Sequence, residues 1–158
     1  MQRLGVVGLC VKVMKIILSH TDPQSKSHVW VKDFSTLDAV VDNNEATEII
    51  VDSFLSAFNF ESLGYILDKI VSKMRLNSKL VIYQKDIDLL AYRYNKTGMA
   101  LSDMNSLLFE DSPSIGCVLN TETISEIIKK SNLKIEEKTL DNETMQSIIT
   151  SRRIAISI

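Results

Sequence analysis

Carboxylates stand at or just after several apolar, strand-like runs of this sequence. Asp33, Asp52 and Asp86 hold such positions, and Ser53 follows Asp52 directly. Open α/β sheets place their ligands outside the carboxyl ends of their strands. We therefore expect Asp52 and Ser53 either to border a ligand site or to cap the helix that follows. Asp86 either shapes a substrate pocket at the same edge or caps the helix that follows it, and capping is the interpretation that we favour.

The residue types that serve metal and nucleophilic chemistry are sparse. The histidines are His20 and His28, and the cysteines Cys10 and Cys117 are far apart without metal-ligand spacing. The sequence contains no G-x-S-x-G elbow, no H-E-x-x-H motif and no P-loop. We expect no metal site, and no residue is compelling as a general base, so the catalytic residue stays unassigned.

Composition indicates one ordinary globular domain. The chain has 158 residues, of which 45% are hydrophobic and 24% charged, so we expect a single domain over 1–158 with an N-terminal extension over 1–13. A net charge of −2 argues against nucleic acid as a partner. The apolar run near the start is too short to span a bilayer. With two widely separated thiols, these features predict a cytoplasmic protein without a membrane partner.

Periodicity predicts alternating strands and helices. Asn59 is expected to cap a helix, and Thr123 with Glu126 has capping-box spacing. Trp30 and the tyrosines are expected to pack in the core or at its rim. Strands are expected at 14–18, 28–31, 47–52, 80–83, 133–140 and 154–158, and helices at 59–74, from 86, around 101–108, 120–130 and 142–150. This alternation predicts a three-layer α/β fold with a mostly parallel sheet and helices on both faces.

From Asp33 onward the order of features resembles the C-terminal half of class I, Rossmann-like S-adenosylmethionine-dependent methyltransferases, over about residues 28–158. The resemblance implies a sheet shortened at its N-terminus with an antiparallel last strand, and S-adenosylmethionine as the cofactor. It also implies that Asp33 contacts the adenine amine, the alternative being a solvated turn residue that caps the next segment. Phe34, Asp52 and Ser53 are the other cofactor-binding candidates. The matching pieces are Lys32-Asp33-Phe34, residues 42–50, 74–82 and 86–94, and the tail 121–158.

The sequence departs from this family where the cofactor is held. The glycine-rich turn expected after the first strand is missing, because Gly5 and Gly8 precede the strand at 14–18. Ser53-Phe54-Leu55-Ser56-Ala57 stands where the group often has H-x-L-E-H. Asn77-Ser78-Lys79 replaces paired glycines, although asparagine tolerates the left-handed backbone conformation that such a turn needs.

Two functions follow with nearly equal weight. The first is a methyltransferase acting on a small-molecule or protein acceptor that we leave open. The second is an inactive methyltransferase-fold module that has lost its cofactor loop and survives as a binding or structural subunit. An exposed sheet edge would give it a reason to form a homo-oligomer. An enzyme acting on a nucleotide sugar or another small ligand is a third alternative with the same architecture.

Overall fold

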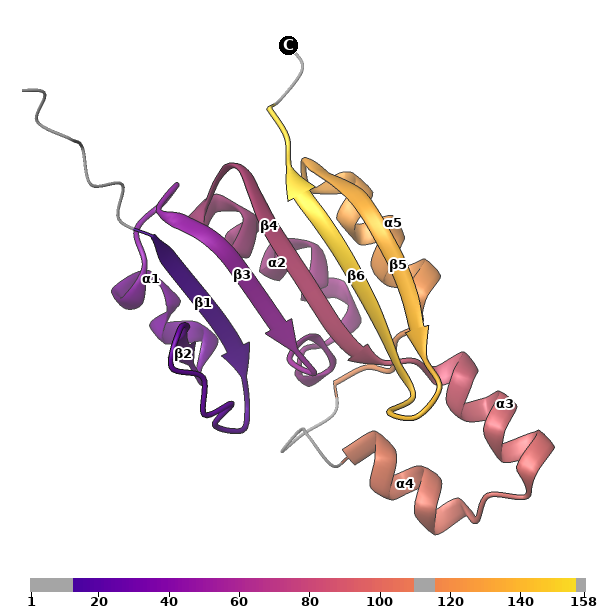
Figure 1. The fold of residues 1–158 in the computed structure, drawn as a ribbon. Helices are drawn as coiled ribbons and strands as arrows, with labels where there is room; N and C mark the ends of the chain where they lie inside the picture. Colours follow the sequence, from indigo (N-terminus) through magenta and orange to yellow (C-terminus); the bar gives the residue numbers. More distant parts are fainter. Residues whose placement is uncertain (1–12, 110–115, 156–158) are drawn as a thin grey trace, which may run out of the picture.

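A computed structural model describes residues 13–109 and 116–155 as one six-stranded sheet with helices (Figure 1). The expected N-terminal extension, Gly5, Gly8, Cys10 and residues 156–158 lie outside these ranges. The strand order is β2-β1-β3-β4-β6-β5. The strands are β1 (Met14–Ser19), β2 (Val29–Val31), β3 (Ala46–Asp52), β4 (Met74–Lys85), β5 (Leu133–Asp141) and β6 (Gln146–Arg153).

The pairing confirms a mostly parallel sheet with an antiparallel last strand. β2, β1, β3 and β4 run parallel, and β6 lies antiparallel between β4 and β5. Ile50 of β3 pairs with Val81 of β4 and with Ile17 of β1, so the two strands expected to build the ligand-facing edge are neighbours. β2 begins level with Ile16, half-way along β1, which allows residues 20–28 to make this parallel connection without a helix.

The helices that cover the sheet share one face. These are α1 (Leu37–Val40), α2 (Leu63–Lys73) and α5 (Thr121–Lys130), whereas α3 (Ile87–Thr97) and α4 (Leu101–Phe109) extend beyond the carboxyl end of β4 (Figure 1). Three short segments are 3-10 helices: η1 (Phe34–Thr36), η2 (Leu55–Ala57) and η3 (Phe60–Ser62). Asn59 caps η3, which leads directly into α2, by accepting the Ser62 N–H at 3.0 Å. None of the helices within 13–109 and 116–155 is long and apolar enough to cross a bilayer.

The core lies between the sheet and these three helices. Ile16, Leu18, Ile49, Val51 and Ile82 point toward it from the strands and are fully buried. Because successive side chains of a strand point to opposite faces, Ile17, Ile50 and Val81 lie on the other face of the sheet. The α/β class is confirmed. The second helical layer that we expected is not observed among the described residues, because no helix follows β1 and α3–α4 leave the sheet at its carboxyl edge.

Two local expectations were wrong. Residues 142–150 were expected to form a helix, but the chain turns after Asp141 and runs as β6. Of the strand expected at 154–158, Ile154 and Ala155 are not in a strand and the remainder lies outside the described residues. Met145, Ile148 and Ile149 fit a helical period, yet β6 pairs along its length with β4 and β5, and this pairing overrides the local pattern. The N-cap of α5 is Asn120, which accepts the Thr123 N–H at 2.9 Å, in place of Thr123.

Candidate functional site at the carboxyl edge of the sheet

The strand order identifies where a ligand would be expected. From β1 the chain moves outward to β2 and then returns past β1 to β3 on its other side. Such a reversal opens a crevice between the carboxyl ends of the two strands that flank it, and open α/β sheets bind ligands there. In this protein the flanking ends are Ser19 of β1 and Asp52 of β3.

The protein's own side chains occupy the β1 side of this crevice. The Trp30 indole N–H donates to the Ser19 carbonyl at 3.0 Å, and the Ser19 hydroxyl donates to the Thr21 carbonyl at 2.7 Å. The His20 ring stacks on Phe54, with ring centroids 4.6 Å apart. Aromatic rings therefore cover the end of the β1 backbone. A glycine-rich turn at this position would leave the same backbone accessible to a ligand.

His20 is held in an apolar setting. Its Nε2 is buried and has no hydrogen-bond partner among the described residues. Desolvation lowers the pKa of His20, a backbone hydrogen bond with Phe54 opposes that shift, and the charge of Lys32 adds to it. The neutral imidazole is therefore the form that suits the folded protein.

Asp33 and Phe34 lie at the end of β2. The Asp33 carboxylate accepts the Ser35 N–H at 2.9 Å and caps η1, and hydrogen bonds from Ser35 hold its pKa below the usual value. Phe34 packs edge-on against Phe58 at 5.6 Å, and Phe58 lies 5.5 Å from Phe54. Phe34 thus belongs to the aromatic cluster under His20, and Asp33 has a capping role at the surface.

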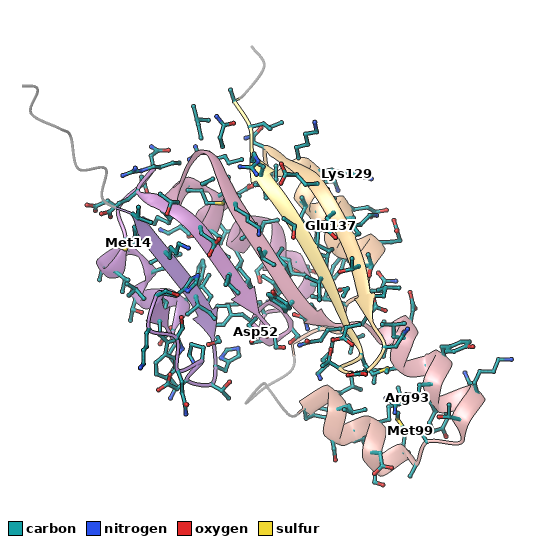
Figure 2. All side chains as sticks on the ribbon, viewed as in Figure 1. Met14, Asp52, Arg93, Met99, Lys129 and Glu137 are labelled. Atoms are coloured by element: carbon teal, nitrogen blue, oxygen red, sulfur yellow. The ribbon has the colours of Figure 1, made fainter. Side chains whose placement is uncertain are left out.

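Asp52 and Ser53 end β3 as expected, with a sharp backbone turn. Ser53 has φ of 50° and is 3% exposed, and its N–H donates to the Tyr83 carbonyl at 2.8 Å. Its hydroxyl donates to Asp52 Oδ1 at 3.3 Å and accepts the Gln146 side-chain N–H at 3.4 Å. This network holds the Asp52 carboxylate at the carboxyl end of β3 (Figure 2).

A shallow pocket of about 560 Å³ lies beside Asp52 on the face of the sheet that lacks helices. Such a volume is ordinary for a small-molecule site. Ile17, Ile50 and Tyr83 are among its apolar lining, and Leu107 of α4 borders it; the polar lining residues are Asp52, Lys85, Glu143, Thr144 and Gln146. Sequence reasoning missed Gln146 because it fell inside the expected helix, and it missed Leu107 because nothing local relates α4 to β3.

Asp86, the candidate substrate residue, is a buried structural connector. It is 2% exposed, and its Oδ1 accepts the N–H groups of Asp88 and Leu89 at 2.9 and 3.2 Å. Its Oδ2 accepts the Thr121 N–H at 2.8 Å and the Thr121 hydroxyl at 2.7 Å. One carboxylate therefore caps α3 and ties it to the start of α5, in agreement with the capping interpretation.

The face without helices also carries an ionic cluster nearer its amino edge. Glu48 accepts from His28 Nε2 at 2.8 Å and lies 3.7 Å from Lys15 Nζ. Burial opposes ionisation of Glu48, but the hydrogen bond from His28 and the charge of Lys15 give a pKa below the usual value. Among residues 13–109 and 116–155, no group of three His, Cys, Asp or Glu side chains could hold a metal ion.

Comparison with known proteins places the fold. No family model matches the chain and no curated protein matches it, but many solved structures do. Magnesium protoporphyrin IX methyltransferase from Synechocystis PCC 6803 with bound S-adenosylhomocysteine has a TM-score of 0.53 at 13% identity, over 83% of this chain and 53% of that one. Mitomycin 7-O-methyltransferase has a TM-score of 0.54 at 18% identity, over 80% and 34%.

A third structure contains a protein partner. It is the complex between the Haloferax volcanii Trm112 methyltransferase activator and the putative methyltransferase, with a TM-score of 0.56 at 8% identity, over 88% of this chain and 66% of that one. The chain spans about a third to a half of the length of the methyltransferases named above. S-adenosylmethionine is the cofactor that these neighbours imply. The chain thus has the fold of class I, Rossmann-like methyltransferases, as the resemblance in its sequence predicted.

Proposed function

We propose that this protein is a non-catalytic binding module built on the methyltransferase fold. The observation that carries the proposal is the covered carboxyl end of β1, where Trp30 bonds to the Ser19 carbonyl and His20 stacks on Phe54. A cofactor in that crevice needs close approach to backbone N–H groups at a glycine-rich turn and a helix N-terminus.

Neither feature is found after β1. The connection 20–28 contains no glycine and no helix, and side chains cover the strand end. The missing glycine turn and helix N-terminus support the proposal that this strand end no longer holds S-adenosylmethionine, and we assign no chemical step to it.

A thermal-shift series with S-adenosylmethionine and S-adenosylhomocysteine tests this proposal. A ligand present at about 100 times its dissociation constant stabilises the native state by about 2.7 kcal/mol. For a chain of this size that corresponds to a rise in melting temperature of about 5–10 °C. We expect no rise for either compound at millimolar concentration, and a saturable rise of several degrees would refute the proposal.

Methyl transfer is the second candidate, and the pocket beside Asp52 is the observation that favours it. In that case Asp52 and Ser53 would hold the cofactor, Asp33 and Phe34 would lie near its adenine, and Asp86 would shape the acceptor site. Exchanging Asp52 for asparagine separates the candidates, because any cofactor-induced melting shift should then decrease. An unchanged shift in Asp52→Asn would remove this pocket as the cofactor site.

A protein is the partner that best suits a binding module of this kind. One structural neighbour is a complex with an activator protein, and the surface of this chain carries exposed aromatic and aliphatic side chains on α3 and α4. We further propose assembly into a homo-oligomer and a cytoplasmic location, the latter because Cys117 is a free thiol. Size-exclusion chromatography with light scattering tests the assembly.

A further inference from the structure

The amino edge of the parallel strands, opposite the crevice at their carboxyl ends, has a pocket of about 670 Å³. Such a volume is ordinary for a small-molecule site. Its polar lining is Asn44, Arg75, Asn132 and Arg153, and its apolar lining includes Leu76 and Ile154. None of the described residues that line it is acidic. The pocket therefore combines two cations and two amides with an apolar wall.

A bulge in β4 forms one wall of this pocket. The partners of β3 change from Met74 to Lys79 along β4, so residues 75–78 stand outside the regular ladder. Bulges redirect side chains and are enriched next to active sites. Here the bulge carries Arg75 and Leu76, and the Leu76 side chain is 58% exposed.

Hydrogen bonds within the protein hold the bulge in shape. The Ser78 hydroxyl donates to the Arg75 carbonyl at 2.6 Å. Arg152 Nη1 donates to the Asn77 carbonyl, also at 2.6 Å, and Asn77 has the left-handed φ of 63° that the turn requires. Because this wall is fixed without a ligand, binding would cost little ordering of the chain.

The Arg75 guanidinium lacks a counter-charge. It is half-buried and makes no hydrogen bond or ion pair with any residue that the structure describes. Arg152, by contrast, is paired with Glu136 at 2.6 Å. A partly desolvated cation is unfavourable unless an anion accompanies it, and the planar guanidinium matches a carboxylate or phosphate group. Arg75 thus indicates an anionic ligand.

Arg153 supplies a second guanidinium, which the pocket holds in place. Its Nη1 donates to the Asn44 side-chain oxygen at 2.6 Å and to the Met74 carbonyl. Its Nε and Nη2 have no partner within residues 13–109 and 116–155. The Ile154 N–H donates to the Asn132 carbonyl at 3.1 Å, which fixes the wall on the other side of Arg153.

Charges around the pocket also favour an anion. Lys129 and Lys130 in the last turn of α5 are exposed and enter no ion pair in the described part of the chain, and Lys129 lies at this end of the sheet (Figure 2). Glu45, which follows Asn44 in the chain, does not line the pocket, and its Oε2 accepts the Asp42 N–H at 3.0 Å.

We propose that this pocket binds a small amphiphilic anion. Its carboxylate or phosphate group is bound by Arg75 and by the remaining donors of Arg153, and its alkyl or aryl body covers Leu76 and Ile154. These two apolar side chains are 58% and 41% exposed, so an apolar body gains by covering them. The site lies at the opposite edge of the sheet from the crevice, and the inference holds whether or not the crevice accepts a cofactor.

Isothermal titration of the 158-residue chain with octanoate and with octyl phosphate tests this site. We expect one molecule per chain with a dissociation constant on the order of 1 mM or tighter for at least one of them, and the tighter of the two identifies the charged group. Octanol has the body without the charge and acetate the charge without the body, so each should bind at least about tenfold more weakly. No saturable binding of either amphiphile, or equal binding of octanol, would overturn the proposal.

A pair of arginine variants then locates the site. Arg75→Ala removes a guanidinium that has no partner in the fold, so the variant should stay folded by circular dichroism and bind the amphiphile about tenfold more weakly or worse. The matched control is Arg93→Ala, because Arg93 is also half-buried without an ion pair among the described residues but lies on α3 (Figure 2). We expect the control to bind like the wild type. Equal losses in the two variants would indicate unspecific attraction between charges and contradict the assignment.

Amide NMR spectra give an independent location. On addition of the amphiphile, the signals of Leu76 and Ile154 should move and those of α3 should not. Shifts confined to the carboxyl edge of the sheet would place the ligand elsewhere and overturn the proposal.

Discussion

Replacing Asp86 by alanine removes one acceptor that serves four donors, and the structure sets the expected cost. Losing the N-cap of α3 costs about 1 kcal/mol. The Thr121 N–H and hydroxyl would also lose their acceptor, and because Thr121 is half-buried each unsatisfied group costs about 1–1.5 kcal/mol, the low end of the range for buried groups. We expect Asp86→Ala to lower the free energy of unfolding by about 3–4 kcal/mol, a large part of the stability of an ordinary domain.

Urea denaturation followed by circular dichroism measures this loss. The matched control is Asp88→Ala, because Asp88 is exposed and makes one side-chain contact, with the Asn120 amide at 2.8 Å. We expect the control to lose less than about 1 kcal/mol. If Asp86→Ala unfolded at the same urea concentration as the control, Asp86 would not be the connector between α3 and α5 that its contacts indicate.

Substitutions at three other positions have predictable outcomes. Because the pKa of His20 is lowered in the fold, the unfolded chain binds more protons, and stability should be full above the ordinary value of 6.5 and decrease as the pH falls below it. His20→Phe keeps the ring stacking on Phe54, and it should reduce the change in melting temperature between about pH 7 and 5. An unchanged pH dependence in this variant would contradict the role given to His20. A side chain at Gly116 would overlap the Phe58 carbonyl, so Gly116→Ala should cost about 1–3 kcal/mol by urea titration. Gly64 has open space around it in α2, so Gly64→Ala should be neutral or stabilise by up to about 1 kcal/mol, and a loss there would contradict the reasoning.

Much of the sheet could be predicted because its strands are continuous apolar runs. The runs that became β1 and β3 were identified with their ends nearly correct, and Asp52 was placed at a carboxyl edge for the right reason. Asn77 has φ of 63°, the left-handed conformation expected from its residue type. Strand pairing through Ile50 and Val81 followed from the alternation of strands and helices.

β6 could not be predicted from local pattern. Its core-facing positions are Ser147, Ile149 and Ser151, all buried, and serines conceal the period of two that marks a strand. Ile148 then points to the other face and completes an apparent helical spacing with Met145. This segment is a strand because it pairs with β4 and β5. That pairing depends on distant parts of the chain and cannot be read from the local sequence.

The sequence also could not predict that one face of the sheet lacks helices. This feature depends on a helix-free connection over 20–28 and on the direction in which α3 leaves Asp86, which Thr121 fixes from a distant part of the chain. The covered end of β1 has a similar origin, because Trp30 and His20 meet the ends of β1 and β3 only after the sheet has formed.

Isothermal titration with S-adenosylhomocysteine tests the central claim most directly. If Trp30, His20 and Phe54 close the crevice between β1 and β3, the titration should give no saturable heat at any accessible protein concentration. Saturable binding of one molecule per chain, weakened when Asp52 is changed to asparagine, would show that this edge of the sheet still accepts the cofactor and would contradict the account.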